Sequence, residues 1–256
     1  MYSTAVRRKA LHLIDSGCSL RSVSASTGIT RSTLREWRDN PEKVQAARAY
    51  CPRCGDAPTL PEPRGDYAYL LGLYLGDGCV SVGGNSSKGV WKLRIICADV
   101  WPGLIEECVR AIQAVRPTNR VLLQQKPGCQ EVSSYSRHWP CLFPQHGPGR
   151  KHMRVIELQP WQQIIVTKHS GEFVRGLFHS DGYRGTNRVR RVLASGEHWY
   201  EYPRYLFSNR SLDILGLCGA ALDRLEVEWR YSRPDAISVA KREAVARLDA
   251  FVGPKY

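Results

Sequence analysis

Acidic side chains and long apolar runs are the features this sequence has least of. Against 37 Lys and Arg there are only 24 Asp and Glu in 256 residues, which leaves a net charge of +13. Such an excess favours a polyanionic partner, nucleic acid first, although a basic solvated surface is the alternative. No apolar run approaches the roughly 18 residues needed to cross a bilayer, and the first residues lack the apolar segment of a secretory signal.

Several familiar chemistries are also missing. The nine cysteines are odd in number and do not suggest a regular set of disulfides, so we expect a reduced, cytoplasmic compartment. Neither the nucleophile elbow G-x-S-x-G nor the phosphate loop G-x4-G-K-[ST] occurs. The sequence therefore argues against a serine hydrolase of that kind and against a P-loop nucleotide-binding protein.

A zinc site is only half present. Cys51 and Cys54 form one C-x2-C pair, and no second pair follows. A solvent-exposed C-x2-C turn without metal is the alternative at this pair. Residues 138–152 are a second candidate zinc site, and a loop packed by Trp139, Leu142 and Phe143 is the alternative there. The more distant residues that could complete or form a zinc site are Cys97, Cys108, Cys129, His138, Cys141, His146 and His152.

The stretch Tyr69–Gly78, YLLGLYLGDG, predicts a short buried helix, because almost no polar face remains. Gly72 and Gly76 lie four residues apart and so share one stripe of that helix. Glycine is costly inside a helix, so two at this spacing indicate close approach of another backbone. Asp77 follows, and Gly78 is suited to ending the helix.

The same pattern returns at Phe173–Gly182, FVRGLFHSDG, where Gly176 and Ser180 take the small positions. Its acid, Asp181, lies 104 residues after the first (181 − 77). If the two stripes pack together, Asp77 and Asp181 meet at two helix C-termini, where both like charge and the helix dipoles are unfavourable. A divalent cation between them would relieve both. Two unrelated helices ending in Asp-Gly turns are the alternative.

Both stretches resemble the LAGLIDADG motif of homing endonucleases, over Leu70–Gly78 and Val174–Gly182, with departures at Leu75 and His179. The resemblance implies an α+β fold of two pseudo-symmetric αββαββα halves, a monomer with an internal pseudo-two-fold, and cleavage of double-stranded DNA. It also implies a helix interface made by Gly72, Gly76, Gly176 and Ser180. A transcription regulator on the same scaffold without nuclease activity, and an RNA maturase, remain as alternatives.

The resemblance further implies where the chemistry lies. Asp77 and Asp181, with the backbone carbonyls of Gly76 and Ser180, would hold Mg²⁺ or Mn²⁺. Lys151 and Lys241 would be basic residues near the metals. The strands after each motif would lie on DNA, and alternation would turn every second side chain toward it. The basic residues expected there are Lys92, Arg94, Arg184, Arg188, Arg190 and Arg191.

Residues 4–40 predict three helices ahead of that domain, with Ser19 and Thr30 as N-caps and a turn at Gly28. The segment GCSLRSVSASTGITRSTLREW resembles the helix-turn-helix modules of resolvases and transposases, whose third helix enters the major groove. A helical bundle that binds protein is the alternative. Leu34 and Trp37 would face the core. The expected DNA-contacting residues are Arg31, Ser32, Thr33, Arg35 and Arg38.

We therefore predict a helix-turn-helix domain over residues 1–50, a C-x2-C knuckle and proline-rich linker over 51–65, and a two-repeat domain over 66–256, with halves 66–168 and 169–256. The strands expected in the two halves are 79–82, 90–98, 121–126, 131–135, 183–193, 202–208 and 228–232, with one more strand and a helix within 236–251.

Overall fold

The computed structural model describes residues 4–39, 61–83, 89–253 and 255–256. The chain forms two compact units, Met1–Thr59 and Leu60–Tyr256. Cys51 and Cys54, the possible half of a zinc site, lie outside the described residues, as does most of the predicted linker. Among the helices described, none has the length and apolar character needed to cross a membrane.

The first unit contains three short helices, α1 (Thr4–Asp15), α2 (Leu20–Thr27) and α3 (Arg31–Asp39). Ser19 caps α2 by accepting a hydrogen bond from the backbone N–H of Ser22 at 3.2 Å. Gly28 ends α2 in the left-handed conformation, which favours glycine. A small core of Ala10, Val23, Ile29, Leu34 and Trp37 holds the three helices together.

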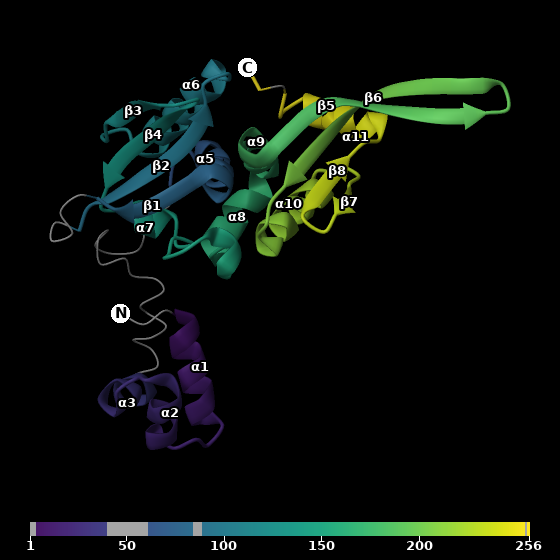
Figure 1. Ribbon diagram of the computed structural model, residues 1–256. Helices are drawn as coiled ribbons and strands as arrows, with labels where there is room; N and C mark the ends of the chain where they lie inside the picture. The colour runs from purple at the N-terminus through teal and green to yellow at the C-terminus, as the bar shows by residue number, and fades with distance from the viewer. Residues whose placement is uncertain (1–3, 40–60, 84–88, 254) are drawn as a thin grey trace. The chain divides into compact units, whose positions relative to one another are not determined.

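The second unit is α+β and contains the same αββαββα order twice (Figure 1). The first half consists of α5 (Arg64–Asp77), β1 (Gly78–Val82), β2 (Trp91–Ala98), α6 (Pro102–Val115), β3 (Val121–Lys126), β4 (Cys129–Ser136) and α7 (Trp139–Leu142). The second consists of α9 (Ser170–Asp181), β5 (Gly182–Leu193), β6 (Gly196–Ser208), α10 (Leu212–Arg224), β7 (Arg230–Arg233), β8 (Ala236–Val239) and α11 (Arg242–Asp249). Helix α8 (Pro160–Lys168) joins them.

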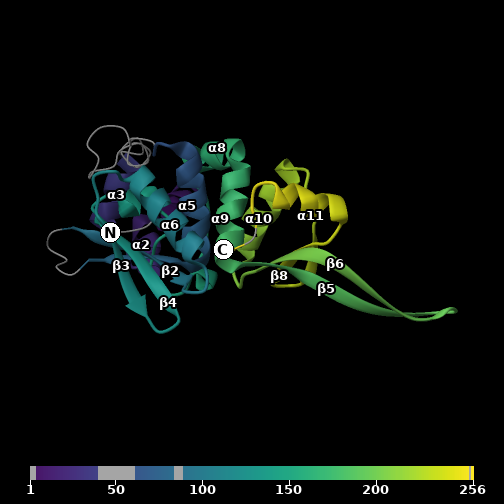
Figure 2. The same cartoon turned by 90° about the horizontal axis from the view of Figure 1, so that it is seen from above.

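Each half has one antiparallel four-stranded sheet, with strand orders β1-β2-β4-β3 and β5-β6-β8-β7. The two orders are the same when each half is numbered from its own first strand, so the repeat seen in the motifs extends through the whole unit. The predicted fold class is confirmed. Helices α10 and α11 lie on one side of β5, β6 and β8, as Figure 2 shows.

Alternation along the strands decides which side chains face the helices. In β2, Leu93 and Ile95 are buried, while Lys92, Arg94 and Ile96 lie on the opposite face. In β6, Tyr205 and Phe207 are buried and both contact Phe178 of α9. Each sheet therefore has a helix face and an open face.

The prediction for β6 was too short. The strand begins at Gly196, six residues before the predicted start at 202, and pairs with β5 from Gly182↔Phe207 to Leu193↔Gly196. Residues 196–201 are exposed throughout, so no buried face supplies an apolar alternation. The pairing with β5, which is not visible in the sequence pattern, determines this part of the strand.

Candidate metal centre and nucleic-acid interface

Helices α5 and α9 approach each other through the small residues of the two motifs. A Cβ atom added at Gly72 would lie 2.5 Å from the carbonyl oxygen of Phe173 and 2.7 Å from the backbone nitrogen of Leu177. One added at Gly176 would collide with the carbonyl oxygen of Tyr69, and one at Gly76 with the side chain of Ser180. Only glycine permits this approach of the two backbones.

The contact places the two motif acids at the same end of the helix pair. A Cβ at Gly76 would lie 3.1 Å from Oδ2 of Asp181, so the second acid stands against the last turn of α5. Asp77 is exposed on one side, but burial of the rest of its carboxylate, together with the charge of Asp181, raises its pKa to about 6. Burial also raises the pKa of Asp181.

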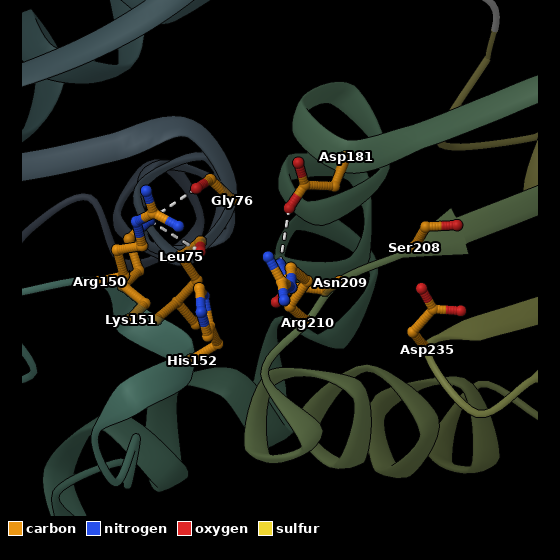
Figure 3. Close-up of a pocket in the computed structure, with 10 residues that line it drawn as sticks. All are labelled: Leu75, Gly76, Arg150, Lys151, His152, Asp181, Ser208, Asn209, Arg210 and Asp235. Atoms are coloured by element: carbon orange, nitrogen blue, oxygen red, sulfur yellow. Dashed lines mark hydrogen bonds between the residues drawn. The ribbon is translucent and has the colours of Figure 1, made fainter.

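Lys151 closes the C-terminus of α5. Its Nζ donates hydrogen bonds to the carbonyl oxygens of Tyr74 (2.5 Å), Leu75 (2.8 Å) and Gly76 (2.6 Å), as Figure 3 shows for the last two. A cation is favourable at this end of a helix dipole. Burial lowers the pKa of Lys151 to about 8, although the charges of Asp181 and Asp77 oppose that shift.

The matching lysine of the second half is Lys255. Its Nζ donates to the carbonyl oxygen of Ser180 at 2.8 Å, the position equivalent to Gly76. Burial lowers the pKa of Lys255, and the charges of Asp77 and Asp181 act against that shift. In each half, therefore, a lysine ammonium group donates a hydrogen bond to the carbonyl oxygen of the residue before the motif acid.

Lys241, which was predicted as the second basic residue, does not make the contact equivalent to that of Lys151. Lys241 is exposed and forms an ion pair with Glu228 at 2.6 Å. A signal for Lys255 did exist in the sequence. Lys151 follows Asp77 by 74 positions (151 − 77), and Lys255 follows Asp181 by the same 74 (255 − 181). The repeat period of the two halves, rather than the local pattern around each lysine, would have identified it.

A cavity of about 360 Å³ opens beside Asp181 (Figure 3). Asn209 donates a hydrogen bond to Oδ2 of Asp181 at 2.7 Å and so fixes the carboxylate in the cavity wall. The lining combines acidic and basic side chains from both halves. It consists of Leu75, Gly76, Arg150, Lys151, His152, Asp181, Ser208, Asn209, Arg210 and Asp235.

The donor set at the helix ends fits a hard divalent cation. Two carboxylates whose pKa values are raised, and two backbone carbonyls that already attract ammonium groups, offer only oxygen ligands. Two carboxylates are too few to form a three-residue cluster, and the described part of the chain contains no group of three or more His, Cys, Asp or Glu suited to a metal. Water and phosphate oxygens would have to complete the coordination.

The described residues that the sequence offered as zinc ligands do not form such a group either. Cys97 and Cys108 are buried in the core, and Cys129 begins β4. In the stretch 138–152, Nδ1 of His146 lies 3.0 Å from the carbonyl oxygen of Phe143. Trp139, Leu142 and Phe143 are buried, which confirms the alternative of a packed loop.

A polar cluster around the buried Glu107 holds the segment that carries Lys255. Glu107, which is 5% exposed, accepts hydrogen bonds from the hydroxyl of Tyr256 (2.7 Å) and from Arg175. Nε2 of His179 donates to the carbonyl oxygen of Val252 at 2.9 Å. His179 stands at the position where the motif resemblance departs, so the departure serves to anchor this segment.

The open face of the first sheet carries Lys92 and Arg94, as alternation predicts. Lys92 and Lys126 both form ion pairs with Glu131, at 2.6 and 2.5 Å. Arg94 lies next to Cys79 on β1, with 3.7 Å between Nη2 and Sγ. This face therefore presents basic side chains, although one buried carboxylate neutralises part of their charge.

In the second sheet the four expected arginines are divided between the two faces of β5. Arg184 is opposite the buried Tyr205, so Arg184, Arg188 and Arg190 share the helix face of β5. Arg191 is one residue further on and lies on the open face. Alternation alone could not assign the faces here, because both sides of this strand are largely exposed.

Helix α3 has a buried and an exposed face, as predicted. Leu34 and Trp37 are buried, whereas Arg31, Ser32, Arg35 and Arg38 are exposed and Thr33 is half-buried. Thr30 contacts the backbone nitrogen of Thr33 at 3.4 Å and so stands at the start of the helix. Arg38 forms an ion pair with Asp39 at 2.8 Å.

No family model matches the chain, and no curated protein matches it. Solved structures do. The homing endonuclease I-DmoI in complex with DNA and Mn is 14% identical, over 75% of this chain and 99% of that one, with a TM-score of 0.46. The LAGLIDADG meganuclease I-AabMI bound to uncleaved DNA is 10% identical, over 72% and 82%, with a TM-score of 0.45.

These neighbours are LAGLIDADG homing endonucleases. They are therefore the family that the two motifs resemble. At such identities and TM-scores the likeness adds no weight to any statement about activity, which has to come from the residues of this chain.

Proposed function

We propose that this protein is a divalent-metal-dependent endonuclease that cuts both strands of a specific DNA site. One observation carries the proposal. Two packed helices end in Asp77 and Asp181, and each half adds a lysine, Lys151 or Lys255, on the carbonyl just before the acid. Packing between two helices does not require two carboxylates with raised pKa values, nor an ammonium group near each of them.

The chain's own residues have distinct roles in this proposal. Asp77, Asp181 and the carbonyls of Gly76 and Ser180 would hold Mg²⁺ or Mn²⁺, which supplies an activated water and neutralises charge on the phosphodiester. Lys151 and Lys255 stand beside those ligands and are placed to stabilise negative charge that develops on the phosphate. Asn209 keeps the carboxylate of Asp181 oriented toward the cavity.

DNA would lie across the open faces of the two sheets, whose first strands, β1 and β5, begin directly after the motif helices. Lys92 and Arg94 in the first half support this placement, since both lie on the open face. Phosphate contacts by such residues release counterions, so we expect affinity to fall steeply with salt.

The decisive experiment is cleavage of a random duplex library in Mg²⁺ or Mn²⁺ by the parent, Asp77→Asn and Asp181→Asn. The parent should cut a subset of sequences, and each variant should be inactive, because the substitution keeps shape but removes the ligand charge. DNA binding should persist or tighten, since a negative charge near phosphate is lost. Calorimetry on the DNA complex measures metal binding directly. Equal binding of the divalent metal by the parent and Asp77→Asn would rule out a metal site formed by the paired acids.

A DNA-binding regulator without nuclease activity is the second candidate, and the first unit favours it. Exposed Arg31 and Arg35 on α3 suit the major groove, and a nuclease can recognise its site with strands alone. If the protein is a regulator, the parent cuts no duplex in any divalent metal, whereas Arg31→Gln with Arg35→Gln changes the sequences selected from a random library. If the first unit does not bind DNA, that double variant selects the same sequences as the parent.

A further inference from the structure

Strands β5 and β6 form a two-stranded ribbon without a counterpart among the described residues of the first half. They pair over twelve positions, from Gly182↔Phe207 to Leu193↔Gly196, but β8 covers only Tyr205–Ser208 of β6. In the first half, β1 has five residues, and all of β2 is paired with β4. The outer part of the ribbon, residues 186–203, extends past the sheet in both views (Figures 1 and 2).

One face of this ribbon continues the helix face of the sheet, and its charges are paired. Arg184 forms an ion pair with Asp249 at 2.6 Å, Arg188 with Glu201 at 3.4 Å, and Arg190 with Glu197 at 2.7 Å. The guanidinium of Arg188 also lies 4.3 Å from the ring centre of Trp199. Each arginine on this face has a carboxylate partner, so the face has little net charge to offer a polyanion.

The opposite face continues the open face of the sheet and contains no acid. Arg191 lies over the ring of Tyr200 at 5.7 Å, and Asn187 donates a hydrogen bond to the hydroxyl of Tyr202 at 2.6 Å. Cross-strand pairing determines which residues share this face. They are Tyr183, Gly185, Asn187, Val189, Arg191 and Leu193 of β5, and Gly196, His198, Tyr200, Tyr202, Arg204 and Leu206 of β6.

We propose that this open face of the ribbon binds the backbone of duplex DNA outside the segment covered by the two sheets, and only on the side of the second half. The proposal rests on the proposed function, because it takes the DNA across the open sheet faces as its starting point. Eight residues of β5, 186–193, at roughly 3.3 Å each reach about 25 Å further, which is roughly seven base pairs. The protected site should then be longer on one side than on the other.

The charge pattern favours DNA over a protein partner. A basic face without acids, with tyrosine hydroxyls and an asparagine amide, supplies the donors that phosphate oxygens accept. The balanced helix face of the same ribbon provides an internal reference, since it has the same backbone and the same reach but paired charges. If this face bound an acidic protein instead, Arg191→Gln and the parent would show the same salt dependence of DNA affinity.

Adjacent residues on opposite faces provide a matched test. Arg190→Gln and Arg191→Gln remove the same charge from exposed positions on one strand, and equal melting temperatures would show that both variants fold. The full chain is titrated with a labelled mixed-sequence duplex in EDTA over a range of salt concentrations. Arg191→Gln should lower the slope of log affinity against log salt by about 0.9, the contribution of one phosphate contact, whereas Arg190→Gln should leave it unchanged.

Two results of this titration would overturn the proposal: a slope in Arg191→Gln equal to that of the parent, or the same reduction of the slope in both variants. Hydroxyl-radical footprinting on a duplex selected from random DNA adds the second test. Protection should extend further on one side of the centre, and a ribbon shortened by joining Asn187 to Tyr202 through two glycines should lose only that extension. A symmetric parent footprint contradicts the proposal. Cleavage that depends on Asp77 and Asp181 would still support the endonuclease in either case.

Discussion

The two halves share one topology but hold their acids differently. Asp181 accepts a hydrogen bond from Asn209 and lines a cavity, whereas Asp77 is exposed on one side and has its pKa raised to about 6. Lys151 bonds three carbonyls of its own half's motif helix, whereas Lys255 bonds one. A repeated fold has thus kept the positions of the functional groups while changing what supports each of them.

The support for the second lysine also crosses between the halves. Tyr256, the neighbour of Lys255, bonds to Glu107 of α6, and the backbone N–H of Leu104 donates to the carbonyl of Tyr256 at 3.2 Å. Lys151, by contrast, lies in a short 3-10 turn of the first half (Lys151–Met153). The second half therefore depends on the first for placing its own basic residue.

The comparison of lysines predicts the largest effect. Lys255→Met should reduce DNA cleavage by about a hundredfold, since it removes a group placed to stabilise phosphate charge. Lys241→Met is the control, because that exposed lysine pairs with Glu228 at the surface. Single-turnover rates on a selected duplex measure both. Similar losses in the two variants would contradict the assignment of Lys255.

The helix contact predicts a difference between two glycines. Gly176→Ala should lower the free energy of unfolding by about 1–3 kcal/mol, because its Cβ meets the Tyr69 carbonyl of the other motif helix. Gly216→Ala in α10 has open space around its Cβ and should raise stability by about 0.5–1 kcal/mol. Urea denaturation of both variants provides the comparison, and a stable Gly176→Ala would show that the helices are further apart.

The raised pKa of Asp77 predicts how stability depends on pH in metal-free protein. The folded state binds the proton of Asp77 more tightly than the unfolded chain, in which the pKa of an aspartate is 3.8. The stabilisation of the folded state by this proton is therefore complete below pH 3.8 and is lost as pH rises through about 6. Urea midpoints of the parent should fall between pH 4 and pH 7 relative to those of Asp77→Asn. A parallel course of the two midpoints would show that the shift is absent.

The link between the halves predicts the smallest effect. Tyr256→Phe removes one hydrogen bond to Glu107, so Lys255 should be less well placed while its charge remains. Cleavage should fall by less than in Lys255→Met, by roughly tenfold, which corresponds to about 1.4 kcal/mol for one bond to a charged group. DNA affinity in EDTA should stay at the parent value. A loss equal to that of Lys255→Met would mean that Tyr256 acts in some other way.

Local patterns predicted much of this structure. Two small-residue stripes that each end in an acid were enough to predict the contact of α5 with α9 and the meeting of Asp77 and Asp181. Where one face of a strand is apolar, as in β2, alternation also assigned Lys92 and Arg94 to the open face. These inferences succeed because helix and strand periodicity follow from backbone geometry, and burial of an apolar face then selects the orientation.

Other features depend on contacts between segments that are far apart in the sequence. Which face of β5 carries Arg188 or Arg191 depends on pairing with Tyr205 in β6, since neither side of the exposed ribbon is apolar. The place of Lys255 depends on the anchoring of its segment by His179 and Glu107, which lie far away in the sequence. Local sequence patterns predicted most of the elements, the motif acids and their meeting. Contacts between distant segments determined which charges are neutralised and which remain available to a ligand.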